Sequence, residues 1–235
     1  MAWSSVAGPW ADLRERLRDA SAHRSWTIDA NDGITATAGL LLGFAGAGAS
    51  SRVLLFTAAA ATIAGGLSVG GASWAEQAAE RDAQLLYARR ESDDLAANPT
   101  AEIEELARHW EERGLTAETA REVAHQLHAH DALAAQLDWE YDFAEPVPAT
   151  FPLWFGVGSG VAYMLGAVVS LLIIYFTPVD VEPWAILTAV TFTLWMSSIV
   201  SSRTGQLMRR RMLARTLVVG ILTMAVSYVA GELLL

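Results

Sequence analysis

One hydrophilic block divides this chain into two apolar regions, and this division limits the possible folds more than any other feature. Between Glu76 and Glu145 there are 18 of the 26 Asp and Glu residues and six Arg, which leaves a net charge of −12. The flanking stretches carry few charges and are long enough to form membrane helices. We therefore expect a membrane protein with an acidic hydrophilic domain, for which a cation is the natural partner.

The composition excludes several classes of function. The chain has 235 residues, of which 53% are hydrophobic, so it has room for about four to six membrane helices and one small domain. It has no cysteine, which excludes disulfides, thiolate metal sites and iron–sulfur clusters. Its net charge of −10 argues against nucleic acid as a partner. There is no HExxH motif or nucleotide-binding glycine loop, so we expect no enzyme and no prosthetic group.

Uncharged stretches predict an all-α membrane protein with five transmembrane helices and a three-helix acidic domain between the second and third. The predicted spans are residues 33–50, 53–75, 151–179, 183–202 and 212–231. The predicted parts are an amphipathic lead-in at 1–28, spans one and two at 29–75, the acidic domain at 76–148 and the last three spans at 149–235. Arginines cluster before the first span, in the acidic domain and before the last span. The positive-inside rule then places the N-terminus and the acidic domain in the cytoplasm and the C-terminus outside. We expect an integral protein of a prokaryotic cytoplasmic membrane, in contact with lipid.

The first two spans are predicted to form a tight helical hairpin, because the loop around Ser50–Arg52 is so short. Small residues recur on both helices at a spacing that lets backbones approach closely. They are Gly39, Gly43, Gly46, Ala47, Gly65, Gly66, Gly70 and Gly71. Ordinary helix packing explains each single glycine equally well.

The sequence predicts three helices in the acidic domain. The first continues the second span to about Leu95, because no Gly or Pro lies between Ser73 and Asn98. Thr100 is the predicted cap of the second helix, and Thr116 begins the third, which ends before Pro146. The predicted buried faces are Ile103, Leu106 and Trp110 on the second helix and Val123, Leu127 and Leu133 on the third.

Two pairs of carboxylates stand near the turn at Asn98. Glu91 and Asp94 are three residues apart on one helix, and Glu102 and Glu105 have the same spacing on the next. If the pairs converge, their repulsion would be relieved by a divalent cation that prefers oxygen ligands. A solvated acidic face is the alternative reading of the same spacing.

Histidines offer a weaker metal signal. His125 and His128 lie on the third helix, and Glu122 with His125 has the Glu-x-x-His spacing of di-iron bundles. A di-iron site needs two such motifs, so surface histidines are the simpler interpretation.

Asp32 is the most informative single residue, because it stands directly before Gly33 at the entrance of the first span. A carboxylate at membrane depth is costly and is usually functional. Desolvation favours its protonated form and a bound cation favours its charged form, so one side chain could exchange a proton for a metal ion, as antiport requires. The alternative is that Asp32 caps the helix that begins there.

Several motifs together resemble the vacuolar iron transporter family of divalent-metal transporters. They are DANDGITATAGLLLGFAGAG, IAGGLSVGGASW, PTAEIEELARHWEERGL, HAHDALAAQL and AYMLG. The resemblance runs from about Ser25 to the last span. It implies five membrane helices, a cytoplasmic helical metal-binding domain and a homodimer.

The resemblance also implies functional residues. The family's Asp-Gly-Ile element falls on Asp32, Gly33 and Ile34, which makes Asp32 the transport-pathway residue. The metal-binding carboxylates of its cytoplasmic domain fall on Glu91, Asp94, Glu102, Glu105 and, at the end of the third helix, Glu140. Auxiliary candidates are Asn31, Thr35, Ser68, Ser73, His125 and His128.

The chain departs from the family pattern at several positions. Ala61 and Val69 replace a Glu and a Met of the pathway, and neither can bind a metal ion. Ser170 and Ile173 replace prolines of the third span, and Gln136 and Leu137 replace methionines of the acidic domain.

Two functions follow from these observations. The first is export of Fe(II) or Mn(II) from the cytoplasm by proton antiport, with Zn(II) or Co(II) as alternative ions. In this reading the acidic domain collects the ion and Asp32 passes it on. The second is a membrane-anchored metal-binding or sensing protein that has lost transport, which the replacements at Ala61 and Val69 favour.

Overall fold

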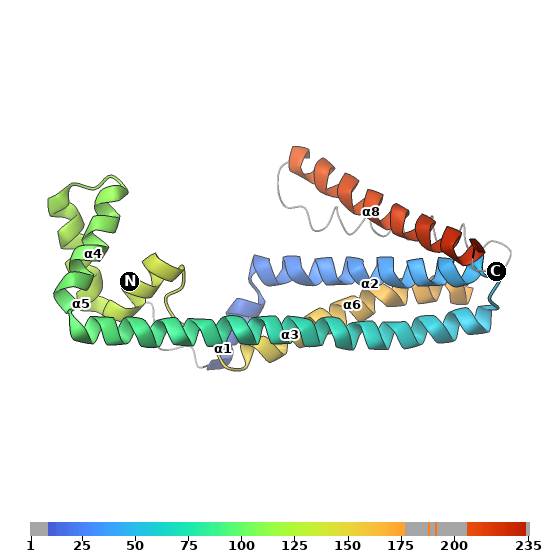
Figure 1. Cartoon of the computed structure of the whole chain (residues 1–235), viewed down its shortest axis with the longest axis horizontal. Coiled ribbons are helices and arrows are strands. Elements are labelled where there is room, and N and C mark those ends of the chain that lie inside the picture. The colour runs from blue at the N-terminus through green and yellow to red at the C-terminus, as the bar shows by residue number, and fades with distance from the viewer. Residues whose placement is uncertain (1–8, 177–187, 189–190, 192–205, 234–235) are drawn as a thin grey trace. The chain divides into compact units, whose positions relative to one another are not determined.

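The structure, a computed structural model, describes residues 9–176, 188, 191 and 206–233 (Figure 1). Every element in that part of the chain is an α-helix, which confirms the predicted all-α class for it. The helices are α1 (Pro9–Leu17), α2 (Ala20–Gly46), α3 (Ser51–Ala97), α4 (Pro99–Glu112), α5 (Ala117–Tyr141), α6 (Phe151–Phe176) and α8 (Gln206–Leu233).

The chain divides into two compact units, and α3 contributes residues to both. One is Met1–Ala75 with Pro152–Leu235, here called the membrane unit, and the other is Glu76–Phe151, here called the acidic module. The absence of Gly and Pro between Ser73 and Asn98 explains why α3 continues from one unit into the other without a break.

Three of the described helices are long and apolar enough to cross a membrane, which identifies an integral membrane protein. An apolar stretch long enough to cross a membrane lies within each of three helical segments: Ser51–Ala97, Phe151–Leu172 and Ala214–Leu233. The predicted first span lies in α2, whose 27 residues include Asp29, Asn31 and Asp32, so its apolar part is shorter. The predicted fourth span, 183–202, lies outside the described residues.

Glycines set the helix packing of the membrane unit, but they face partners that the sequence did not predict. A Cβ at Gly43 or Gly46 would meet the backbone of α8, and one at Gly66 or Gly70 would meet α6. The small residues of the α2–α3 hairpin therefore bring α8 and α6 close, and do not serve mainly to pack the hairpin on itself. Gly71 faces open space.

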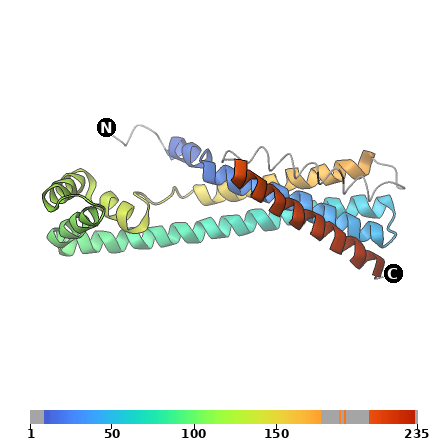
Figure 2. The same cartoon turned by 90° about the horizontal axis from the view of Figure 1, so that it is seen from above.

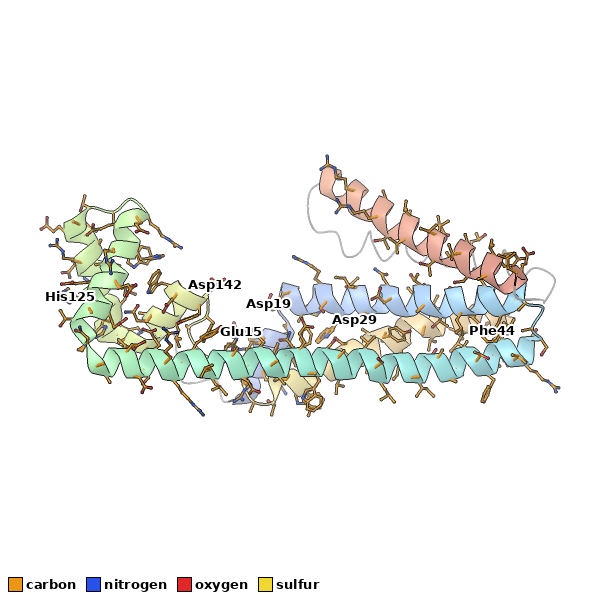
Figure 3. The ribbon with its side chains drawn as sticks, viewed as in Figure 1. Glu15, Asp19, Asp29, Phe44, His125 and Asp142 are labelled. Carbon is orange, nitrogen blue, oxygen red and sulfur yellow. The ribbon has the colours of Figure 1, made fainter. Side chains whose placement is uncertain are left out.

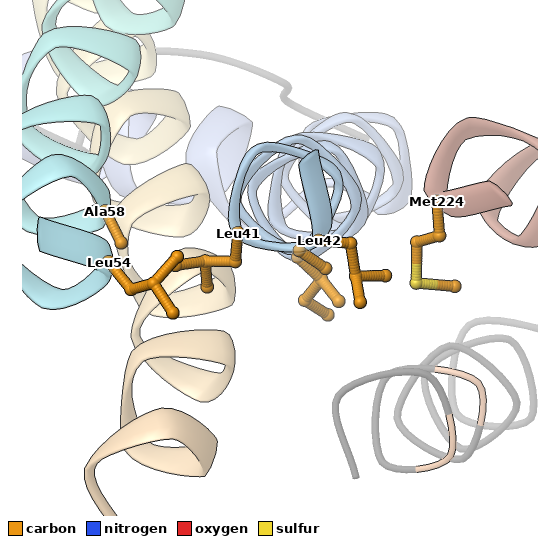
Figure 4. Close-up of a cluster of buried hydrophobic side chains, with 7 residues drawn as sticks. Leu41, Leu42, Leu54, Ala58 and Met224 are labelled. Atoms are coloured by element: carbon orange, nitrogen blue, oxygen red, sulfur yellow. The ribbon is translucent and has the colours of Figure 1, made fainter. Parts of the chain in front are cut away.

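The apolar core of the membrane unit lies where α2, α3 and α8 meet (Figure 4). The spacing of i, i+4, i+7 and i+8 along α2 puts its core residues on one face. The buried cluster is Ile34, Ala38, Leu41, Leu42, Leu54, Ala58 and Met224. Figures 1 and 2 show α8 crossing α2 at an angle. Met224 of α8 belongs to the buried cluster, as Figure 4 shows.

In the acidic module, α4 is capped by Asn98 and not by Thr100 as predicted. The Asn98 side chain accepts a hydrogen bond from the amide of Ala101, and Pro99 occupies the first turn of the helix. Proline suits that position because its ring presets φ and it has no amide hydrogen to satisfy.

The third helix of the module, α5, follows Thr116, which was its predicted first residue and caps it, and the helix bends at Asp131, which has an extended backbone. Asp131 Oδ1 accepts from the amide of Ala134 and so caps the second half of the helix. The buried residues of α5 differ from the predicted ones: Leu127 is exposed, and the buried set is Ala120, Ala124, Gln136 and Leu137. Asp142 then ends the helix in a left-handed conformation, with φ of 63° (Figure 3).

Candidate metal sites

Glu91 is the buried centre of the acidic module's carboxylates. Its side chain projects from α3 and is 4% exposed, which is rare for a glutamate. Burial raises the pKa of Glu91 to about 7, and the hydrogen bond and charge of Glu140 and the charges of Glu102 and Asp94 act in the same direction. A carboxyl in this setting can hold a proton near neutral pH and release it to a cation.

Glu102 belongs to the same cluster, although it lies on α4. Burial raises its pKa, and the charges of Glu105 and Asp94 add to the effect. The turn at Asn98 therefore brings both predicted pairs together, and the end of α5 adds Glu140. We call these five side chains the carboxylate cluster: Glu91, Asp94, Glu102, Glu105 and Glu140.

The carboxylate cluster is loosely arranged. Within the described residues, no three His, Asp or Glu side chains already converge at metal-binding distances. Arg90 lies 3.8 Å from Asp94 Oδ2, and both side chains are largely exposed. Charge repulsion opposes a closer arrangement of the ionised carboxylates, and a bound divalent cation would relieve it.

Gln136 contacts one member of the cluster, Glu102, and sequence reasoning missed this contact. It is 1% exposed, and its Nε2 donates to the backbone oxygen of Glu102 at 2.8 Å and to Glu102 Oε2 at 3.3 Å. Trp139 Nε1 donates to Gln136 Oε1 at 2.7 Å. The chain Trp139–Gln136–Glu102 therefore links α5 to a carboxylate of α4.

The predicted histidines lie on α5 without a visible part in the cluster. His125 is exposed, and His128 is half-buried, with an Nδ1 atom that has no hydrogen-bond partner among the described residues. The Glu122 carboxylate of the Glu-x-x-His pair accepts from Gln126 Nε2 at 2.7 Å. The histidines' auxiliary role therefore stays a prediction.

In the membrane unit, Asp32 lies inside α2 and does not cap it. The helix begins at Ala20, where Asp19 caps it by accepting from the amide of Ser21 at 3.1 Å. This removes the N-cap reading of Asp32. The side chain is exposed on the single chain, near enough to Asp29 and Tyr163 for electrostatic interaction.

The other pathway candidates are spread over α2 and α3. On α2, Asn31 and Thr35 are half-buried, and Asn31 Oδ1 has no hydrogen-bond partner in the described structure. On α3, Ser68 is exposed, whereas Ser73 is half-buried.

The residues that depart from the family pattern lie on α3 and α6. Ala61 and Val69 are half-buried on α3, and neither side chain has an atom that can bind a metal ion. Ser170, in place of a proline, is fully buried and donates to the backbone oxygen of Ile34 at 3.2 Å, which ties α6 to α2.

Two known proteins are similar in sequence to this chain. A vacuolar iron transporter of Acanthamoeba castellanii is 34% identical over 138 residues, which are 57% of this chain and 50% of that protein. Vacuolar iron transporter 1 of Arabidopsis thaliana is 26% identical over 174 residues, 73% of this chain and 68% of that protein. The chain thus spans half the length of the Acanthamoeba relative. The model of the VIT family matches residues 23–232, so the predicted resemblance is confirmed and the chain belongs to the VIT family.

Proposed function

We propose that this protein moves divalent metal ions, Fe(II) or Mn(II), across a membrane. The observation that carries the proposal is the carboxylate cluster around buried Glu91, in a chain whose described helices include three that are long and apolar enough to cross a membrane. Both relatives are named as iron transporters, which supports metal as the cargo. Oxygen ligands favour Fe(II) and Mn(II), with Zn(II) and Co(II) as weaker alternatives.

The proposed topology has five spans. Contacts between α2 and α6 rise together along both helices, from Trp26 with Phe155 to Ile34 with Ser170, so these helices run parallel. The contacts of Gly39 with Thr223 and Gly46 with Tyr228 show that α8 runs the same way. Parallel α6 and α8 support a further crossing between them, which is where the sequence predicts its fourth span.

The proposed assembly is a homodimer with Asp32 at the interface. An exposed aspartate on a membrane helix would otherwise face lipid, which is costly. A second copy of the same face would enclose a polar pathway between two Asp32 side chains. In this arrangement Asp32 takes the ion and gives up a proton.

The proposed direction is export from the cytoplasm by proton antiport, with the acidic module on the cytoplasmic side. The arginine distribution supports this orientation. The relatives are eukaryotic proteins named vacuolar, so they give no support to a prokaryotic membrane, and the proposal names no organelle.

A second candidate function is metal binding without transport. It rests on Ala61 and Val69, which lie on α3 without any ligand atom. In that case the carboxylate cluster would act as a buffer or sensor at the membrane.

Two sets of variants in proteoliposomes separate these functions. Asp32→Ala should abolish Mn(II) flux and leave binding to the acidic module intact. Joint replacement of Glu91, Asp94, Glu102 and Glu105 by Ala should weaken that binding strongly. If the quadruple variant binds Mn(II) as well as the parent, the cluster is not the binding site. If the parent binds Mn(II) without any flux, the second function is the correct one.

A further inference from the structure

The end of α5 and the linker that follows it, residues 142–150, are fastened to one face of α3. On α3, Gln84, Tyr87 and Glu91 follow one another at spacings of three and four residues, so their side chains share that face. Each of the three meets a different residue of the chain that leaves α5, and all these residues belong to the acidic module. Three contacts in a row restrict how far the end of α5 can shift along α3.

Gln84 makes the first contact, with Val147 of the linker. Gln84 is 8% exposed, and its Oε1 accepts from the amide of Val147 at 3.0 Å, whereas Arg81 Nε donates to the backbone oxygen of Val147 at 3.0 Å. Val147 stands between Pro146 and Pro148, so its amide is the only backbone donor of that stretch. Side chains of α3 therefore bind both backbone groups of Val147, which fixes the linker on that helix.

The second contact joins two tyrosine rings. Tyr87 of α3 stacks on Tyr141, the last residue of α5, with ring centroids 4.4 Å apart and an angle of 15° between the planes. Aromatic pairs at this separation stabilise by more than the area that they bury. Tyr87 is still 38% exposed, so a smaller side chain there would remove the contact without opening a cavity in the apolar core. The stack ties the end of α5 to α3 at the residue next to Glu140.

Glu140 makes the third contact, and this one does not hold itself together. The side chain of Glu140 hydrogen-bonds that of Glu91 on α3. Two carboxyl groups this close repel each other when both are ionised. In the metal-free protein that repulsion would move Glu140 away from α3 unless other contacts held the end of α5. The ring stack and the Val147 hydrogen bonds are such contacts, and they act on the same face of α3.

We propose that Tyr87 and Gln84 are positioning residues for metal binding, which hold the end of α5 on α3 so that Glu140 stays beside Glu91 and binds the same ion. Neither side chain touches the ion itself. This role deepens the proposed function and rests on it, because it requires the carboxylate cluster to bind the metal.

Isothermal titration of the full-length protein with Mn(II) tests the proposal in an Asp32→Ala background, which lacks the proposed pathway ligand. Tyr87→Leu should weaken Mn(II) binding by about threefold to tenfold, the size expected for the loss of one aromatic contact. Tyr87→Phe keeps the ring and should restore the affinity of the background. Leu86→Ala is the matched control, because Leu86 is the neighbouring residue of α3 and is 65% exposed. Gln84→Leu should also weaken binding, and it provides the result if Tyr87→Leu does not fold.

A double-mutant cycle shows whether the effect acts through Glu140. Glu140→Gln alone should weaken Mn(II) binding more than Tyr87→Leu does. Once Glu140→Gln is present, Tyr87→Leu should lower the affinity by less than about twofold, because no carboxylate is left to position. A general effect on the folding of the acidic module would instead give the same loss with and without the Glu140 carboxylate, and that result would overturn the proposal.

Two further results would overturn the positioning role alone. One is background affinity in both Tyr87→Leu and Gln84→Leu, and the other is a Tyr87→Phe variant that loses as much affinity as Tyr87→Leu. In either case the carboxylate cluster would remain the binding site. Failure of the proposed function is distinct: a background protein that binds no Mn(II) in its acidic module would refute the metal site and the positioning role together.

Discussion

At the scale of single residues, Glu91 shows how burial raises the pKa of a common side chain into the neutral range. Its unfolded-state pKa is close to 4.5, and in the fold the pKa rises to about 7, mainly through burial. Between these values the folded protein binds more protons than the unfolded protein does. Glu91 should therefore stabilise the metal-free acidic module most below about pH 4.5. This contribution to the free energy of unfolding should fall as the pH rises towards about 7 and level off above that.

The variant Glu91→Gln should remove most of this pH dependence, because a neutral amide replaces the titrating group. Glu102, whose pKa is also raised, should leave a smaller slope in the same direction. Amide hydrogen exchange in Glu76–Phe151 of the full-length protein, corrected for intrinsic rates, measures this. An equal slope in parent and variant would show that the Glu91 carboxyl is not the group that titrates.

Gln136 allows a second prediction at this scale. Gln136→Leu should weaken Mn(II) binding to the acidic module by about tenfold, because Glu102 loses the amide that positions it. Gln126→Leu is the matched control on α5, since Gln126 is exposed and bonds Glu122 outside the cluster. Isothermal titration with Mn(II) compares the two. Restored affinity in Gln136→Asn, which keeps an amide donor, would show positioning through hydrogen bonds, and equal losses in both leucine variants would contradict it.

The sequence predicted the carboxylates but not the residues that support them. Spacing along a helix indicates that Glu91 and Asp94 share a face, and the family resemblance indicated their role. The partners of Gln136 depend on which helices meet. The periodicity of residues along one helix does not predict contacts between helices.

At the scale of elements, the sequence predicted α3 well, because a long stretch without Gly or Pro has one simple outcome. It predicted the wrong cap for α4, where Asn98 and Pro99 together outcompete Thr100. It also missed the bend inside α5, where Asp131 has an extended backbone and caps the second half of the helix. The small residues were correctly recognised as packing sites, but their partners are α6 and α8.

Glycine packing leads to a prediction about helix association. Gly231→Ala should destabilise the membrane unit by about 1–3 kcal/mol, because the new Cβ would clash with the backbone oxygen of Gly43 on α2. Gly71→Ala is the control: its Cβ meets nothing, so alanine should be neutral or stabilise by up to about 1 kcal/mol through helix propensity. Unfolding in mixed detergent micelles measures both. Equal stability of the two variants would contradict the close contact between α2 and α8.

At the scale of the whole molecule, the proposed function requires an acidic module that collects the ion and a membrane unit that moves it. The exposed face of α2 around Asp32 is the proposed dimer interface. The chain has no cysteine, so single cysteines report contacts directly. A twofold interface brings the same residue of two copies together near its axis.

Ala36→Cys, one turn after Asp32 on an exposed position of α2, should form a disulfide-linked dimer under mild oxidation. Leu165→Cys is the control, because Leu165 is 64% exposed but lies on α6. Non-reducing gel electrophoresis of membranes reads the result. A dimer band with Leu165→Cys and none with Ala36→Cys would place the interface elsewhere.

The central claim is transport with few pathway ligands, and Mn(II) flux into proteoliposomes under an imposed pH gradient tests it most directly. The account predicts flux in the parent that depends on the gradient and disappears in Asp32→Ala. The double variant Ala61→Glu, Val69→Met, which restores ligands to α3, should keep or increase that flux. A parent without flux, together with a double variant that gains it, would contradict the account and identify a metal-binding membrane protein that no longer transports.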